Sequence, residues 1–303
     1  MSVTLIQSEI APEVSPVELK PADGVDLCRK LMVEPGSRVA LGSIDPNDCG
    51  DETYDTTVPA ILAHIQKIDR LQYVMHAEGK HSLLIVLQGL DACGKDGVVR
   101  HILSGVNSAG CRVAAFKQPT YVELAHDFLW RVHPHVPSRG EMAVFNRSHY
   151  EDVLVARVHN LVPDGVWSRR YTLINDFENL LSVGNNTTVL KFFLHISKEE
   201  QLARFKRRLE DPSRRWKISE ADYQEREHWD EYIEAYEEML CNTSTFQAPW
   251  YIVPANNKWF RDLVVSQIIA RTMDDLDMKL PAPSVDLAHI RRRYHAAEVA
   301  ASS

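Results

Sequence analysis

The sequence lacks long apolar runs, clustered cysteines and an excess of basic residues. No apolar run approaches the roughly 18 residues that a membrane-spanning helix needs, so we predict no membrane span. Residues 1–21 carry glutamates and lack a basic start, so we predict no secretory signal peptide. The five cysteines have no metal-ligand spacing, which is typical of a reduced, cytoplasmic protein; they are Cys28, Cys49, Cys93, Cys111 and Cys241.

The charge balance also excludes a class of partner. A net charge of −8, from 34 basic and 42 acidic residues, argues against a general nucleic-acid binder. A chain with this balance binds a polyanion only where it concentrates basic residues locally.

The ends of the chain are weakly patterned. We therefore predict an N-terminal arm over residues 1–35, a folded domain over 36–280 and a C-terminal tail over 281–303. The domain has enough residues to bury a sizeable core.

A glycine-rich loop follows the most apolar stretch of the chain. Leu83 to Leu87 predicts a buried strand, the spacing Gly89-x4-Gly94-Lys95 follows, and a helical pattern begins near Val98. In such a loop, backbone N–H groups, the helix N-terminus and the lysine surround phosphate oxygens. The candidate phosphate-binding residues are Gly89, Ala92, Gly94, Lys95, Asp96 and Gly97. The alternative is a glycine turn without a ligand.

Two acidic residues set this loop apart from the common pattern. Asp96 stands where Ser or Thr usually holds Mg²⁺, and Asp91 lies inside the loop. Carboxylates beside a phosphate are repulsive unless a cation lies between them. Both residues therefore indicate a bound Mg²⁺.

Strand and helix patterns alternate, which predicts an α/β protein with a parallel sheet flanked by helices. The predicted strands are 83–87, 112–116, 141–146, 187–196 and 250–253, and the predicted helices include 59–77, 98–109, 123–132, 152–160, 169–181 and 262–278, with two further helices after Ser197 and Ser219.

Polar residues follow the second and third strands, at the edge where the glycine loop also lies. Lys117 is a candidate phosphate ligand, with a solvated loop cation as the alternative. Arg147 has the charge to clamp a phosphoryl group, and Glu151 and Asp152 are candidate metal ligands. The alternative for this segment is a turn that caps the next helix, and we interpret His149 as structural.

Seven basic residues lie between Arg204 and Lys217, interrupted by Pro212 and Trp216. Such a run is often a solvated helix face. A proline-broken basic loop also suits a lid that closes over phosphates, and we predict one at about residues 206–226. By contrast, the aromatic stripe from Trp229 to Met239 predicts core packing.

Four stretches together resemble the family-2 polyphosphate kinases, over roughly residues 38–280. They are Gly89 to Gly97, Phe116 to Thr120, Gly140 to Asp152, and Asp211 to Lys217. The resemblance implies a P-loop kinase fold like that of thymidylate kinase, with a helical lid. It further implies Mg²⁺-dependent, reversible phosphoryl transfer between inorganic polyphosphate and a nucleotide. The implied functional residues are Asp91, Lys95 and Arg147, with Arg214, Arg215 and Lys217 of the lid on phosphates.

Within that family, Asn146 indicates which subgroup this chain resembles. Many members have Asp before the arginine, and the Asn-Arg-Ser-His-Tyr-Glu-Asp form resembles the subgroup that phosphorylates AMP as well as ADP. Since Asn carries no charge, metal binding would rest on Asp91, with Glu151 as helper. Adenine nucleotides are the expected acceptors, guanine nucleotides stay open, and the family implies a homo-oligomer. The alternatives are an ATP-dependent nucleoside-monophosphate kinase and a non-catalytic phosphate-binding module.

Overall fold

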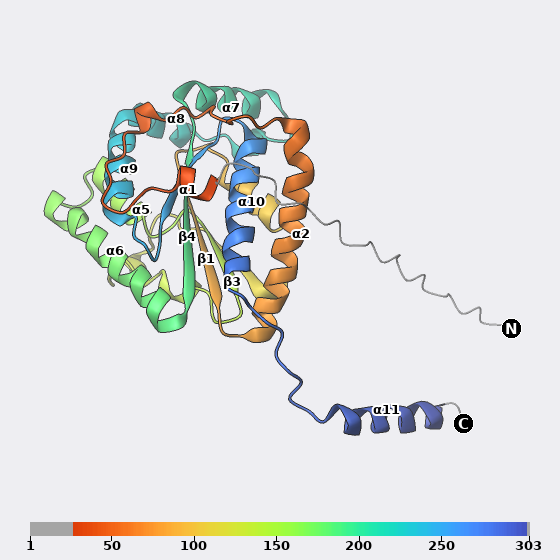
Figure 1. The fold of residues 1–303 in the computed structure, drawn as a ribbon. Coiled ribbons are helices and arrows are strands. Elements are labelled where there is room, and N and C mark those ends of the chain that lie inside the picture. The colour runs from red at the N-terminus through yellow and green to blue at the C-terminus, as the bar shows by residue number, and fades with distance from the viewer. Residues whose placement is uncertain (1–26, 302–303) are drawn as a thin grey trace.

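The computed structural model describes residues 27–301, so most of the predicted arm over 1–35 lies outside the described residues. Five parallel strands form one sheet in the order β2-β3-β1-β4-β5 (Figure 1). The strands are β1 (Ser82–Gln88), β2 (Cys111–Ala114), β3 (Met142–Asn146), β4 (Thr187–His195) and β5 (Trp250–Pro254). The predicted α/β class and parallel sheet are confirmed.

Helices cover both faces of the sheet (Figure 1). The α-helices within residues 27–301 are α1 (Leu27–Leu31), α2 (Tyr54–Glu78), α3 (Lys95–Ile102), α4 (Tyr121–Leu124), α5 (Glu151–Val158), α6 (Asp164–Asn185), α7 (Lys198–Glu210), α8 (Glu220–Glu227), α9 (Trp229–Thr243), α10 (Lys258–Asp275) and α11 (Leu287–Ala301).

The central strand β1 is buried along its whole length, as its continuous apolar run predicts. Alternate side chains enter two cores. Leu83, Ile85 and Leu87 pack with α2, α3 and α10. Leu84 and Val86 pack with α5, α6 and α9. The predicted aromatic stripe of α9 lies in this second core.

Two predicted helices are shorter than their patterns indicate. The helix predicted over 98–109 ends at Ile102, and the Asn107 side chain starts a separate turn by accepting from the Ala109 N–H. The helix predicted over 123–132 is wrong beyond Leu124. There Asp127 accepts from the Leu129 N–H at 3.0 Å, and such a bond competes with a continuing helix.

Residues 27–35, the part of the predicted arm that the structure describes, pack onto the domain. Leu27 and Val33 are buried, and the Val33 N–H donates to Trp250 O at 2.8 Å, along β5. At the other end of the chain, α11 lies apart from the sheet on an extended segment and its side chains are exposed (Figure 1).

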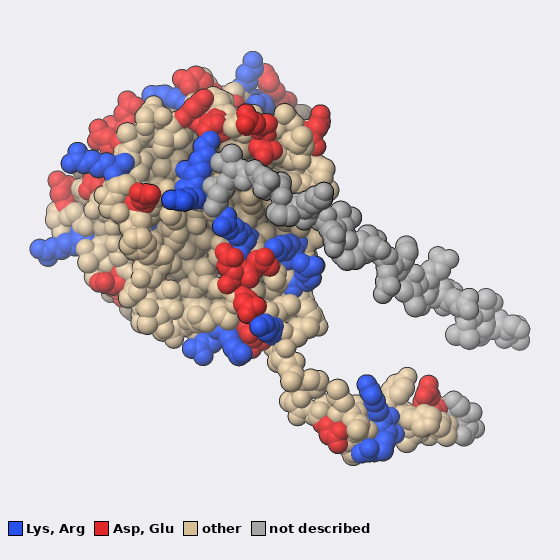
Figure 2. Space-filling view, in the orientation of Figure 1, with Lys and Arg blue, Asp and Glu red and all other residues tan. Residues whose placement is uncertain are grey.

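Charged side chains of both signs are interspersed on the face of the domain shown in Figure 2, and basic ones gather on α11. Among the helices that the structure describes, none combines the length and the apolar character needed to cross a membrane.

Candidate active site

The glycine loop, the end of β3 and the segment predicted to be a lid meet at the carboxyl edge of the sheet. The loop connects β1 to α3, Arg147 follows β3, and α7 begins just beyond β4. Because parallel strands all end at this edge, it collects side chains that lie far apart in the sequence.

The loop backbone requires its glycines. Gly89 and Gly94 have φ angles of +143° and +110°, which side chains rarely allow. A Cβ on Gly94 would lie 2.1 Å from Arg261 Nη1, and one on Gly89 would lie 2.7 Å from Leu194 O. Gly97, in the first turn of α3, also packs against Arg261. The spacing read from the sequence is therefore needed for backbone conformation and for close packing.

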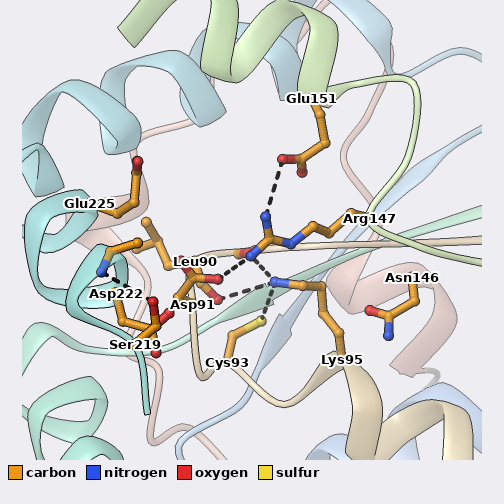
Figure 3. Close-up of polar contacts among 12 residues, drawn as sticks. Leu90, Asp91, Cys93, Lys95, Asn146, Arg147, Glu151, Ser219, Asp222 and Glu225 are labelled. Atoms are coloured by element: carbon orange, nitrogen blue, oxygen red, sulfur yellow. Dashed lines mark hydrogen bonds and ion pairs between the residues drawn. The ribbon is translucent and has the colours of Figure 1, made fainter. Parts of the chain in front are cut away.

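Lys95 lies along the inside of the loop. Its side chain is nearly buried, and Nζ donates to Gly89 O at 2.6 Å and to Leu90 O at 3.3 Å (Figure 3). Two carbonyl groups at the start of the loop therefore hold its charge in place.

Arg204 binds backbone carbonyl groups of the glycine loop. Nη1 donates to the carbonyls of Ala92 and Cys93 at 2.9 and 2.7 Å, and Nη2 donates to Ala255 O. Gln201, one turn earlier, donates to Asp91 O at 3.0 Å. Sequence reasoning counted Arg204 in the basic run just before the predicted lid, but the structure buries it against the glycine loop.

Arg147 joins the loop to α5. Nη2 lies 2.5 Å from Asp91 Oδ1, and Nη1 lies 3.9 Å from Glu151 Oε2 (Figure 3). Burial alone lowers the pKa of the guanidinium, but the two carboxylates outweigh it and raise that pKa. Burial raises the pKa of Glu151, and Arg147 offsets this only in part; Glu151 also accepts from Gln88 at 3.0 Å. Asp91, Lys95, Arg147 and Glu151 are therefore brought together, as predicted.

Asp96 connects β3 to the lid. It accepts from Asn146 Nδ2 at 2.8 Å and pairs with Lys217 Nζ at 3.1 Å. Burial alone raises the pKa of Asp96, but the Asn146 amide and the Lys217 ammonium outweigh it, so that pKa is lowered. The residue at the usual hydroxyl position thus contacts the lid.

The remaining predicted residues have other partners. Arg214 pairs with Asp211 at 2.8 Å, and Arg215 Nε donates to Leu209 O at 3.0 Å. Lys117 is exposed. Its carbonyl accepts from Arg131 at 2.7 Å, and Arg131 also pairs with Asp152 at 2.9 Å. Asp152 is therefore tied to Arg131.

Two residues join the site that sequence reasoning did not place there. Burial and the charge of Asp91 raise the pKa of Asp222 in α8, although Arg208 pairs with it at 2.8 Å. Burial lowers the pKa of Lys258, the first residue of α10, and positive charges from α7, the lid and α10 lower it further; they are Arg204, Arg207, Arg214 and Arg261. Negative charge therefore gathers at Asp91 and Asp222, which we call the acidic side, and positive charge gathers around Lys258, which we call the basic side.

The acidic side suits a divalent cation. Asp91 and Asp222 carry negative charges that repel each other, and a cation between them would relieve this repulsion. No cluster of three or more His, Cys, Asp or Glu residues with metal-binding geometry occurs within residues 27–301. Mg²⁺ commonly takes one or two carboxylates and completes its shell with substrate phosphate and water.

A parallel sheet, a Gly-x4-Gly-Lys loop after its central strand and a basic segment over that loop define a P-loop kinase-like protein. Residues 55–281 match the family model for polyphosphate kinase 2 (PPK2). The chain belongs to the polyphosphate kinase 2 family.

Similar proteins agree along most of the chain. An AMP/ADP-polyphosphate phosphotransferase of Meiothermus ruber is 48% identical over 257 residues, which are 84% of this chain and 96% of that protein. An ADP-polyphosphate phosphotransferase of Rhodopseudomonas palustris is 43% identical over 269 residues, 84% of this chain and 92% of that protein. The crystal structure of polyphosphate kinase 2 from Arthrobacter aurescens matches with a TM-score of 0.85 and 38% identity, over 89% of this chain and 96% of that one.

Proposed function

We propose that this protein catalyses Mg²⁺-dependent, reversible phosphoryl transfer between inorganic polyphosphate and adenine nucleotides, converting AMP to ADP and ADP to ATP. The observation that carries the proposal is that Asp91, Lys95 and Arg147 lie together at the glycine loop (Figure 3). The relatives named for this transfer support it.

The reaction needs alignment and charge compensation more than covalent help from the protein. Lys95 and the loop amides hold the phosphoryl group being transferred and its neighbours. Arg147, released from Asp91 by an incoming phosphate, balances the charge that develops on it. Asp91, with Glu151 as helper, would hold Mg²⁺, which neutralises phosphate charge. Asp91 also orients the accepting phosphate oxygen.

The basic side of the site supports a polyanionic substrate. Burial lowers the pKa of Lys258, and the positive charges of Arg204, Arg207, Arg214 and Arg261 lower it further. A bound chain of phosphates would offset this repulsion between positive charges. Lys117, Arg214, Arg215 and Lys217 are proposed phosphate ligands. The lid at about residues 206–226 would bring the last three of them over the loop.

Asn146 supports acceptance of both AMP and ADP. Its neutral amide donates to the Asp96 carboxylate, whereas an aspartate at position 146 would repel that carboxylate. The Meiothermus ruber relative named for both acceptors is consistent with this assignment. Guanine nucleotides as acceptors, a homo-oligomeric state, a cytoplasmic location and the division into arm, domain and tail stay predictions.

A coupled assay tests the proposal with purified protein, Mg²⁺ and long-chain polyphosphate, with AMP and ADP offered separately. Product from both acceptors is expected. Product from ADP alone would overturn the assignment based on Asn146. Phosphorylation of AMP by ATP but not by polyphosphate would replace the proposal with a nucleoside-monophosphate kinase. Tight polyphosphate binding without turnover would indicate a non-catalytic module.

A further inference from the structure

A charged pair lies in the core directly behind the catalytic segment. Lys191, in the middle of β4, and Glu178, on α6, are buried, and Nζ lies 2.6 Å from Glu178 Oε2. The ammonium also donates to Tyr150 OH at 2.9 Å and to Thr243 O at 2.6 Å, so its three hydrogens all have partners.

The other oxygen of Glu178 binds two consecutive residues of the segment after β3. Oε1 accepts from Tyr150 OH at 2.8 Å and from His149 Nε2 at 3.2 Å. Burial alone raises the pKa of Glu178, but Lys191 and His149 outweigh it and lower that pKa. Through these contacts Glu178 fixes two neighbouring side chains in the interior.

Stability does not explain this arrangement. Burying an ion pair costs desolvation energy, and a well-packed apolar pair of similar volume is often at least as stable. The network does, however, adjoin a backbone conformation that needs support. Arg147 has a φ of +64°, and residues with side chains keep such angles only where their surroundings impose them.

The chain on either side of that strained residue is fixed. The Arg147 N–H donates to Leu87 O at 3.2 Å, and Ser148, His149 and Tyr150 are fully buried. Residues 148–150 thus anchor the turn on one side and β1 anchors it on the other. With its backbone held on both sides, Arg147 directs its guanidinium to Asp91.

We propose that Glu178 and Lys191 are positioning residues: through His149 and Tyr150 they hold the backbone of Arg147 in its left-handed conformation and aim its guanidinium at the phosphate loop. This inference rests on the proposed function. It predicts that disturbing the pair reduces catalysis only while Arg147 is present.

A double-mutant cycle tests this. The double variant Glu178→Gln/Lys191→Met removes the charges with little change in volume. It should lower kcat about 10- to 100-fold, since small misplacements of a catalytic group cost this much, and leave KM for polyphosphate within about twofold. In the Arg147→Ala background the same double variant should lower kcat by less than about threefold, because its effect passes through the missing guanidinium.

The control is a buried polar pair at the other end of the sheet. Ser82 Oγ and Thr187 Oγ1 lie 2.8 Å apart and are fully or almost fully buried. Ser82→Ala/Thr187→Val should leave kcat within about twofold in either background, since it lies away from Arg147. If Glu178→Gln/Lys191→Met does not fold, Tyr150→Phe removes one hydroxyl of the network and should show the same dependence on Arg147.

The outcomes separate the two proposals. An equal loss of kcat in both backgrounds, with an active parent enzyme, overturns the positioning role and leaves the proposed function intact. A loss confined to the parent background supports it. A parent protein without polyphosphate-dependent transfer overturns the proposed function, and the positioning role falls with it.

Discussion

Removing the charge of Lys95 gives a direct prediction about the phosphate loop. Lys95 is 9% exposed, and Lys95→Ala deletes its ammonium, which lies 2.6 Å from Gly89 O. A phosphate oxygen entering the loop meets this charge with little water between them. Loss of one preorganised group of this kind costs about 3–4 kcal/mol of transition-state stabilisation. We therefore expect kcat to fall roughly 10²- to 10³-fold.

The assay is polyphosphate-dependent formation of ADP from AMP, with Lys95→Met as the matched variant. Met retains the aliphatic packing, so both variants should lose turnover alike. Their free energies of unfolding should change by no more than about 1–3 kcal/mol, the worth of hydrogen bonds to a charged group. A folded Lys95→Ala protein with a rate within tenfold of the parent would refute the role given to Lys95.

Three further predictions concern the loop and its neighbours. Asn146→Asp places a carboxylate beside Asp96, whose oxygen now lies 2.8 Å from the amide; apparent Mg²⁺ affinity should rise about tenfold in a rate titration, and an unchanged affinity would contradict this. Lys217→Gln breaks the 3.1 Å pair with Asp96; KM for polyphosphate should rise several-fold while the melting temperature stays within a few degrees, because exposed pairs add about 0–1 kcal/mol. Gly94→Ala places a Cβ 2.1 Å from Arg261 Nη1; turnover should fall at least as far as in Lys95→Ala, and normal activity would show that the loop conformation is not required.

Local patterns were sufficient to predict the sheet and the phosphate loop. The continuous apolar run of β1 requires cover on both faces, and the glycines that follow have the backbone angles and close contacts that exclude side chains. The segment after β3 was predicted to lie at the same edge, and Arg147 does lie against Asp91. These features depend on residues that are adjacent in sequence or on a general property of parallel sheets.

What the sequence could not predict depends on distant partners. Arg204 and Lys258 occur in ordinary helical patterns, and only the packing of α7 and α10 against the loop shows their role. Asp222 likewise comes near Asp91 through the placement of α8. The prediction of a helix over 123–132 was wrong beyond Leu124 for a local reason, since a hydrogen bond that the Asp127 side chain accepts from the Leu129 N–H competes with the helix.

The central claim is that polyphosphate itself donates the phosphoryl group. The most direct measurement follows phosphate residues lost from long-chain polyphosphate and ADP formed from AMP in one reaction, without ATP. The account predicts one terminal phosphate lost per ADP formed, with both signals abolished by a Mg²⁺ chelator and by Lys95→Met. Nucleotide formation without loss of polyphosphate, or loss of polyphosphate to free phosphate without nucleotide formation, would contradict it.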